Sequence, residues 1–516
     1  MKSFAAAGFL ALFCVCLASY LAFAATFGRF VQMDEVFFKA AGREWAASGH
    51  FAAPEIHGVP TADPPGFLVM QPPLSEIWFA QLPGYTFAFG VFARLFGFGP
   101  EQCVMYDALI HATLALLTFL TCRRLTRDQY PALAVLAGLA VLPLGTLARP
   151  DELAMCLGLA GTLPFLEETL DAKRVAFSGL LFGLCAATSA GAAILLGIVT
   201  MPFFAPHWRS PARAAALLTI WIASAAVTFA GALAPILIAH PDALHQFVGH
   251  ASGHFWHGRY RQAFLKTWTF GVPYLAVACG GLIVAAVSLP AWKRERSAWM
   301  RLWIGPLAAI VFLAIFLPDK YLYLWFIGPM TLVATILTLH SLRQRSAAGI
   351  MRPLGLALAC CYAMAIAPCL QATINIVAIP PAQRLERNAR LVRELVPGGS
   401  TVVTDDDWWI LAERCRVYDP YFSRPRPEEV DFIILGGDGS GDPRRMRDVP
   451  ENLASYAAKH FTCVMNELND QPVRVLGRPL GHTGQGFGVY VLGRRDTSFK
   501  PPALAHYDRT SRQSDR

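Results

Sequence analysis

The sequence predicts an all-α polytopic membrane domain of about eleven transmembrane helices with added juxtamembrane helices, followed by a small C-terminal α/β domain outside the membrane. Three observations predict this fold class: 55% of the 516 residues are apolar, only 16% are charged, and the apolar residues gather into long runs. A soluble chain carries about 25% charged residues, and a disordered chain is poor in apolar ones. The net charge of +8 comes without the basic domain or stripe that nucleic-acid binding requires, so we expect no nucleic-acid partner.

A helix crosses the hydrocarbon of a bilayer in roughly 20 residues. Apolar runs that can form such spans lie near residues 5–28, 104–122, 131–148, 152–167, 175–190, 191–206, 214–238, 268–290, 302–318, 322–341 and 353–376. The first run could also be a signal peptide that is cleaved after Ala22-Phe23-Ala24. Because it is longer than the apolar region of a signal peptide, about 7–15 residues, we interpret it as a span.

The charges between the spans predict the orientation. With the N-terminus in the cytoplasm, basic residues crowd the inner connections, at 123–127, 173–174, 209–213, 293–301 and 343–352, and are sparse in the short outer ones. Inner connections of membrane proteins carry this excess of Lys and Arg. We expect an integral protein of a bacterial inner membrane, with a cytoplasmic N-terminus and a periplasmic C-terminal domain.

The chain divides at the last span. Residues 1–376 form the expected transmembrane domain, with a long outer loop at 29–103, and residues 496–516 read as a disordered tail. Between them, residues 377–495 alternate short apolar runs with a helical pattern, which is typical of an α/β domain. We expect strands at 401–404, 430–435 and 488–492 and a helix at 451–461. Cys415 and Cys463 lie in this domain, where an oxidising compartment would allow a disulfide between them.

The first outer loop carries the candidate chemistry. Asp34 and Glu35 open a helical pattern over residues 32–51, which we expect to lie flat on the outer leaflet. Its apolar face would hold Phe37, Ala41 and Trp45, and its polar face Lys39 and Arg43. Carboxylates in a first turn can simply stabilise the helix, but one kept ionised at the membrane surface can also act as a general base.

Three further segments reach the same outer side. The aromatic stretch 77–98 is predicted to be interfacial or re-entrant, because counting it as a span would reverse the charge asymmetry of the later loops. The turn ALARPDEL places Arg149, Asp151 and Glu152 between two spans, and the turn PDKYLYLW places Asp319, Lys320, Tyr321 and Tyr323 at another. Each turn alone is typical of a solvated span end, but together they gather ionisable groups on one side.

This arrangement resembles the GT-C superfamily of membrane glycosyltransferases, which includes protein O-mannosyltransferases and the transferases that add aminoarabinose to lipid A. The resemblance covers residues 1 to about 376 and is carried by the order and spacing of motifs. These are the Asp-Glu pair after the first span, the SGHF and QPPL stretches, the RPDE turn and the DKYLYLWFIGP turn. It implies that Asp34 is the catalytic base, that Glu35 has a structural or acceptor-positioning role, and that Asp151 lines the same cavity.

The resemblance also implies the reaction. The donor would be a polyprenyl-phosphate sugar held in the lipid bilayer, and the acceptor would be a hydroxyl group of a lipid, glycan or protein, glycosylated with inversion and with no required cofactor. Some relatives have a lysine before the Pro-Pro pair that helps to hold the donor phosphate, whereas this chain has Gln71. The candidates for donor and phosphate binding are therefore Arg149, Asp151, Lys320, Arg259, Arg261 and Tyr321.

Two interpretations stay open. His250, His254 and His257 have spacings that suit a divalent metal on a helix, but their loop could equally contact the donor or acceptor, or lie in the wet interface. The alternative to a transferase is a transporter or flippase of lipid-linked sugars. Transporters commonly keep ionisable groups at mid-membrane, whereas the span charges here lie at the span ends, apart from Asp107 and His111 near the start of the second span.

Overall fold

The computed structural model divides the chain into two compact units. The helical unit comprises Met1–Ala52, Thr61–Pro72 and Glu76–Ile376, and the C-terminal unit comprises Ala53–Pro60, Pro73–Ser75 and Val377–Arg516. The structure describes residues 2–27, 33–53, 76–79, 82–126, 131–133, 150–166, 170–204, 210–248, 272, 274–284, 293–316, 324–344, 353, 355–364, 377, 385–404, 414–418, 425–436, 449, 451–466, 474–475, 478–479 and 489–495.

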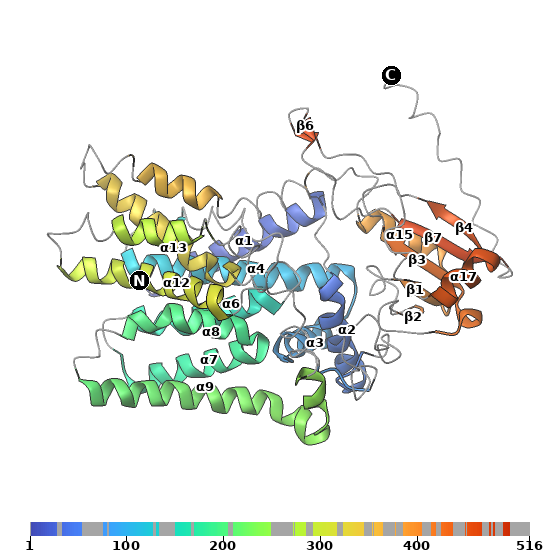
Figure 1. The fold of residues 1–516 in the computed structure, drawn as a ribbon, viewed down its shortest axis with the longest axis horizontal. Coiled ribbons are helices and arrows are strands. Elements are labelled where there is room, and N and C mark those ends of the chain that lie inside the picture. The colour runs from blue at the N-terminus through green and yellow to red at the C-terminus, as the bar shows by residue number, and fades with distance from the viewer. Residues whose placement is uncertain are drawn as a thin grey trace. The chain divides into compact units, whose positions relative to one another are not determined.

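The helical unit is a bundle in which long helices run alongside one another, with two shorter helices, α2 and α3, grouped at one end (Figure 1). The helices of this unit that Figure 1 labels are α1 (Lys2–Phe27), α2 (Met33–Ser48), α3 (Gly84–Phe96), α4 (Pro100–Thr126), α6 (Pro150–Thr162), α7 (Ala172–Thr188), α8 (Ala190–Thr200), α9 (Pro211–Ala239), α12 (Lys293–Phe316) and α13 (Leu324–Gln344). A 3-10 turn, η1 (Leu163–Leu166), extends α6. The predicted all-helical character of this unit is confirmed, whereas the count of about eleven transmembrane helices stays a prediction.

Three described helices are long and apolar enough to cross a membrane: Gly8–Thr26, Glu101–Leu125 and Pro211–Ala239. Five shorter apolar helices lie at Ala190–Phe204, Tyr274–Val284, Met300–Phe316, Leu324–His340 and Gly355–Met364. All eight fall within predicted spans or overlap them. The predicted span 131–148 lies outside the described residues except for 131–133.

The aromatic stretch 77–98 forms one short helix, α3, of 13 residues. At 1.5 Å per residue α3 is about 20 Å long, which is shorter than the roughly 30 Å hydrocarbon layer. Phe87, Val91 and Leu95 are exposed at intervals of four residues, so they form one apolar stripe along α3. A short helix with such a stripe suits the predicted position at the membrane interface.

The C-terminal unit contains a five-stranded sheet in the order β2-β1-β3-β7-β4. Its strands are β1 (Thr401–Thr404), β2 (Arg416–Tyr418), β3 (Phe432–Gly436), β4 (Phe461–Asn466) and β7 (Val489–Arg494). β1 pairs in parallel with β2 and β3, and β7 pairs antiparallel with β3 and β4. The described part also contains the helices α15 (Leu385–Leu395) and α17 (Glu451–His460), the 3-10 turn η5 (Pro427–Glu429) and a small ribbon of β5 (Arg474–Val475) and β6 (Arg478–Pro479). The predicted α/β character is confirmed.

The core of this unit explains why the sheet forms. Val403, Ile433 and Leu435 from the central strands pack with Leu453 of α17 and with Phe461 at the start of β4. Burial alternates along β7, as expected where one face of a strand meets a core.

The disulfide considered between Cys415 and Cys463 is not formed, since both thiols are free. Cys415 directly precedes β2 and Cys463 lies in β4, and these two strands are the opposite edges of the sheet. With neighbouring strands about 4.8 Å apart, four intervals separate the edges by roughly 19 Å. A disulfide needs Cα atoms within about 7 Å.

Candidate functional site

Asp34 and Glu35 stand in the first turn of α2, where the sequence predicted them. The turns that follow are packed into the helical unit: Phe38, Ala40 and Ala41 are buried, as is Lys39. α2 packs against α3 at glycines, because the backbone of Gly42 lies against Thr86 and Gly90 of α3. The candidate base therefore belongs to a helix that is fixed by its neighbours.

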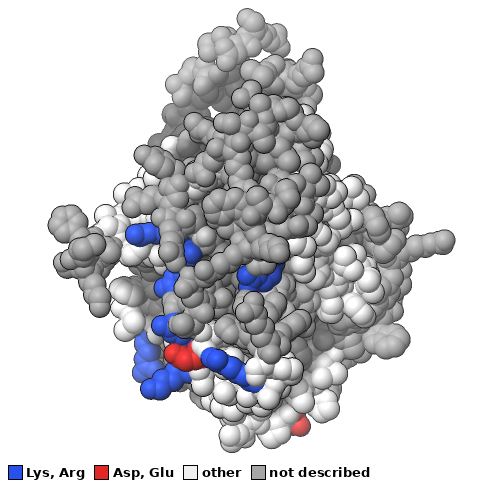
Figure 2. All heavy atoms as spheres, turned by 90° about the vertical axis from the view of Figure 1, so that its left-hand side faces the viewer, with Lys and Arg blue, Asp and Glu red and all other residues white. Residues whose placement is uncertain are grey.

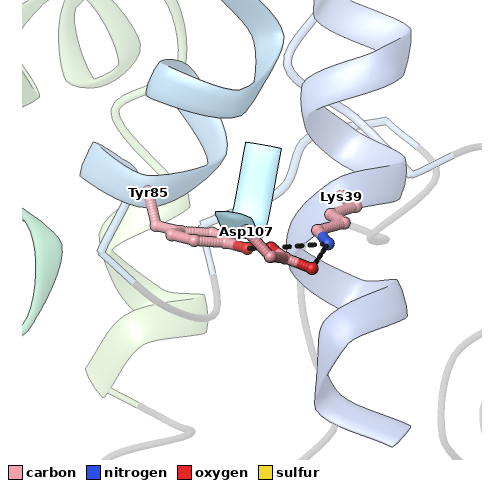
Figure 3. A network of polar contacts seen from close by, with 3 residues as sticks. All are labelled: Lys39, Tyr85 and Asp107. Atoms are coloured by element: carbon pink, nitrogen blue, oxygen red, sulfur yellow. Dashed lines mark hydrogen bonds and ion pairs between the residues drawn. The ribbon is translucent and has the colours of Figure 1, made fainter. Parts of the chain in front are cut away.

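Lys39 anchors α2 to α4 through a buried ion pair (Figure 3). Its Nζ atom donates to both carboxylate oxygens of Asp107, at 3.0 and 2.9 Å. Tyr85 of α3 donates its hydroxyl to the same carboxylate at 3.5 Å. Lys39 is 1% exposed and Asp107 2%. The prediction that set Lys39 on the polar face of a surface helix is wrong, because this face of α2 meets a carboxylate of another helix.

One turn further along α4, His111 meets the second acidic motif. Its Nδ1 atom lies 3.6 Å from Oε1 of Glu152 in the first turn of α6. The ring of Tyr20, near the end of α1, lies 5.4 Å from the His111 ring, measured between centroids. His111 and Glu152 are both buried. Asp107 and His111, four residues apart on one face of α4, thus tie together the helices that carry the two acidic motifs.

The contacts also show which helix ends share a side. Phe9 lies against Phe119, whereas Tyr20 lies against His111, so α1 and α4 run antiparallel. The end of α1, the beginning of α4 and the beginning of α6 are therefore at the same end of the bundle. The end of α7 joins them, because Gly84 at the start of α3 lies against Ala187 and Thr188. We call this the acidic end.

The opposite end of these helices is basic. The guanidinium group of Arg123, at the end of α4, lies 5.2 Å from the centre of the Phe9 ring, and the Arg213 side chain at the start of α9 donates to the Leu170 carbonyl before α7. Figure 2 shows Lys and Arg side chains gathered on the described part of one face of the molecule. A cavity of about 390 Å³ lined by Phe9, Leu120, Arg123 and Arg124 lies at this basic end, away from both acidic motifs.

Segment 76–79 is held at the acidic end by hydrogen bonds to its backbone. The Gln246 side chain accepts from the Phe79 amide at 2.8 Å and donates to the Ile77 carbonyl at 3.0 Å. The Trp78 amide donates to the carbonyl of Phe51, just after α2, at 2.7 Å. Both sides of the loop 29–103 are therefore fixed to the bundle where the structure describes them.

The other predicted site residues divide into two groups. Asp151 is buried in the first turn of α6, beside Glu152. The rest lie outside the described residues: Arg149, Arg259, Arg261, Lys320, Tyr321, His250, His254 and His257. Within the described part of the chain, no group of three or more His, Cys, Asp or Glu residues could hold a metal ion.

The sequence pattern did not identify all the residues that bind α2 to α4. Ionisable groups inside a span are costly and pair with one another, and Asp107 and His111 are such groups. What the pattern could not show is that the partner of Asp107 is Lys39, 68 residues earlier. The hydrogen bond from Tyr85 to Asp107 could not be predicted either, because Tyr85 lies among other aromatic residues in the stretch 77–98.

No family model and no curated relative matches this sequence. Three solved structures are similar to it: the oligosaccharyltransferase of Archaeoglobus fulgidus in complex with Zn and sulfate, ArnT from Cupriavidus metallidurans bound to undecaprenyl phosphate, and the arabinofuranosyltransferase AftD from Mycobacteria. Their sequence identities are 12%, 12% and 14%, and their TM-scores are 0.41, 0.47 and 0.45. The match covers 88%, 96% and 95% of this chain and 71%, 99% and 40% of theirs, respectively.

All three are GT-C glycosyltransferases, the superfamily that the motifs of this sequence resemble.

Proposed function

We propose that this chain is an integral membrane glycosyltransferase that moves a sugar from a polyprenyl-phosphate donor to an acceptor hydroxyl on the extracytoplasmic side, with inversion at the anomeric carbon. Asp34 is the general base. The acceptor is a lipid, a glycan or a protein, and the membrane is the inner membrane of a bacterium.

One observation carries this proposal: the two acidic motifs, far apart in the sequence, lie against successive turns of α4 at one end of the bundle. Asp107 holds the helix that begins with Asp34 and Glu35, and His111 meets Glu152 beside Asp151. The basic ends of the same helices lie opposite. Because cytoplasmic ends carry the excess of Lys and Arg, the acidic end is assigned to the outer side of the membrane.

In the proposed reaction the acceptor oxygen attacks the anomeric carbon while Asp34 takes its proton. The new bond from the acceptor oxygen to carbon forms as the bond from carbon to phosphate oxygen breaks, and the polyprenyl phosphate leaves with the electron pair. A single displacement inverts the anomeric carbon, whereas a retaining double displacement needs a nucleophile as well as an acid/base. A positioned general base contributes typically 10²–10⁴ in rate.

The departing phosphate develops negative charge, so pre-placed cations stabilise the transition state. We assign this role to Arg149 and Lys320, with Arg259, Arg261 and Tyr321 as further donor contacts, since Gln71 brings no charge. Lys39 is not assigned to the phosphate, because both oxygens of Asp107 already bind its ammonium group. No metal is required in this scheme. A metal-binding role of His250, His254 and His257 is tested by metal analysis of the purified protein.

The experiment compares the wild type with Asp34→Asn, using purified protein in lipid nanodiscs, a labelled polyprenyl-phosphate sugar and candidate acceptors. We expect Asp34→Asn to lower the transfer rate by about 10²–10⁴ while its yield and melting temperature stay normal. The matched control is Asp171→Asn, a carboxylate at the basic end that caps α7 by accepting from the Arg174 amide, a role that asparagine also fills. Transfer by Asp34→Asn at the rate of Asp171→Asn excludes Asp34 as the base.

A further inference from the structure

We infer that Lys39, Asp107 and Tyr85 form a positioning device that fixes the height and rotation of α2 on α4, and so places Asp34. This inference rests on the proposed function and adds residues that act on the reaction through Asp34, without touching the substrate.

The burial of the pair argues against a role in stability alone. Lys39 and Asp107 are 1% and 2% exposed, and removing two charges from water costs free energy that their attraction often only offsets. Apolar side chains of similar volume commonly stabilise such a site as well or better. Apolar side chains, however, do not fix the rotation and height of one helix on another, because apolar packing tolerates small shifts of a helix that an ion pair does not.

The distances within the pair show that its geometry is directional. The ammonium group of Lys39 is nearly equidistant from both carboxylate oxygens, at 3.0 and 2.9 Å, and Tyr85 donates to one of these oxygens from a third helix. A slip of α2 by one residue would move Lys39 by 1.5 Å along the helix and turn it by about 100°. Both buried charges would then lose their partner, which is strongly unfavourable, so a single register is selected.

The other contacts of α2 with the α3 segment are made by aromatic rings and by glycine. Phe38 lies against Tyr85 and Trp45 against Phe87, with ring centroids 5.6 and 4.6 Å apart, and Arg43 lies over the Phe98 ring. α2 meets α3 through Gly42 and Gly90, where the ring of Trp45 also lies close to the Gly90 backbone. Glycine contacts allow close approach but have no side chain that would fix the rotation of one helix on another. Lys39 adds a directional contact on the same segment of α2.

The position of Lys39 lets it control Asp34. The two residues are five positions apart on one helix, about 7.5 Å along its axis. A helix transmits a displacement along this length without loss, so a shift of 1 Å at Lys39 is also a shift of about 1 Å at the base. Misplacing a catalytic group by that much can cost 10²-fold in rate.

The test separates position from stability with four variants in the nanodisc assay. K39M and D107L each leave one buried charge without its partner, so both should melt below the wild type. The double variant K39M/D107L removes both charges and, at Tyr85, only the Asp107 acceptor, so it should regain most of the melting temperature that the single variants lose. We expect its kcat to stay at least tenfold low, while its KM changes by less than about threefold. The matched control is T162V/T200V, which removes a buried hydrogen bond between two hydroxyl groups of α6 and α8 that lie 2.8 Å apart. This control should keep the wild-type kcat and KM.

A double variant with recovered stability and wild-type kcat overturns the inference, since the pair would then serve packing only. If K39M/D107L does not fold, Y85F decides, because it removes one hydroxyl donor without changing the ring. Y85F with a normal melting temperature and a kcat lowered about threefold supports positioning, and an unchanged kcat overturns it. The proposed function fails separately, through absence of transfer by the wild type or normal transfer by Asp34→Asn.

Discussion

The contact between α2 and α3 predicts how a single added methyl group should act. In Gly42→Ala the new Cβ would lie 2.6 Å from the Thr86 carbonyl oxygen, 3.1 Å from the Gly90 amide nitrogen and 3.0 Å from Cδ1 of Phe89. Two of these three are backbone atoms of α3. α3 cannot easily retreat, because a Cβ at its first residue, Gly84, would itself lie 2.8 Å from the Ala187 carbonyl oxygen of α7.

Two opposing effects set the magnitude. Alanine in a helix is favoured over glycine by about 1 kcal/mol, whereas overpacking a close contact costs typically 1–3 kcal/mol. The control Gly231→Ala carries only the first effect, because nothing lies within 4 Å of a Cβ at this exposed position in α9. The difference in unfolding free energy between the two variants isolates the clash, so Gly42→Ala should be about 1–3 kcal/mol less stable than Gly231→Ala.

The assay is equilibrium unfolding of the purified variants by SDS titration in mild detergent, followed by tryptophan fluorescence. Transfer measured on the same samples should fall in Gly42→Ala and stay normal in Gly231→Ala, because only the first pushes α2 away from its site. Equal unfolding free energies for the two variants would refute the close packing of α2 on α3 and, with it, the rigid placement of Asp34.

Two further predictions concern the C-terminal unit and the orientation. Burial raises the pKa of the Cys415 thiol, and the thiolate is the reactive form. A water-soluble maleimide at pH 7.5 should therefore modify the exposed Cys463 before the half-buried Cys415, and Cys415 should react faster as the pH rises. Mass spectrometry of C415S and C463S variants assigns the sites, and faster modification of Cys415 would contradict this. In intact cells and in a C415S/C463S background, which removes the native thiols of the C-terminal unit, an impermeant maleimide should label E451C in α17 but not R174C at the basic end. The reverse pattern would place the basic end outside the cytoplasm and so contradict the assigned orientation.

The parts of the fold that depend on local pattern could be predicted from the sequence. The span at Gly8–Thr26 and the strand at Thr401–Thr404 are bounded apolar runs, and the structure forms both. The expected helix at 451–461 ends one residue earlier, at His460, because Phe461 begins β4 and pairs with Arg494 of β7. β4 carries polar and exposed residues, so it is a strand through pairing with β7 and not through its own pattern.

The candidate site likewise contains residues that could be predicted from the sequence and residues that could not. The carboxylates at the starts of α2 and α6 could be found from sequence, because they follow span ends and begin helices. The ion pair could not, because helical periodicity separates the faces of α2 but does not say whether a face meets water, lipid or another helix. Lys39 on an isolated α2 would be exposed. It is buried because α4 brings Asp107 to it, and this depends on the packing of the whole bundle.

The anomeric configuration of the product tests the central claim most directly. A polyprenyl-phosphate sugar of known configuration, incubated with the purified wild type and an acceptor alcohol, should give a glycoside of the opposite configuration by NMR, because one base at Asp34 supports one displacement. A product with the donor's configuration, or no glycoside with any donor of this class, would contradict the account.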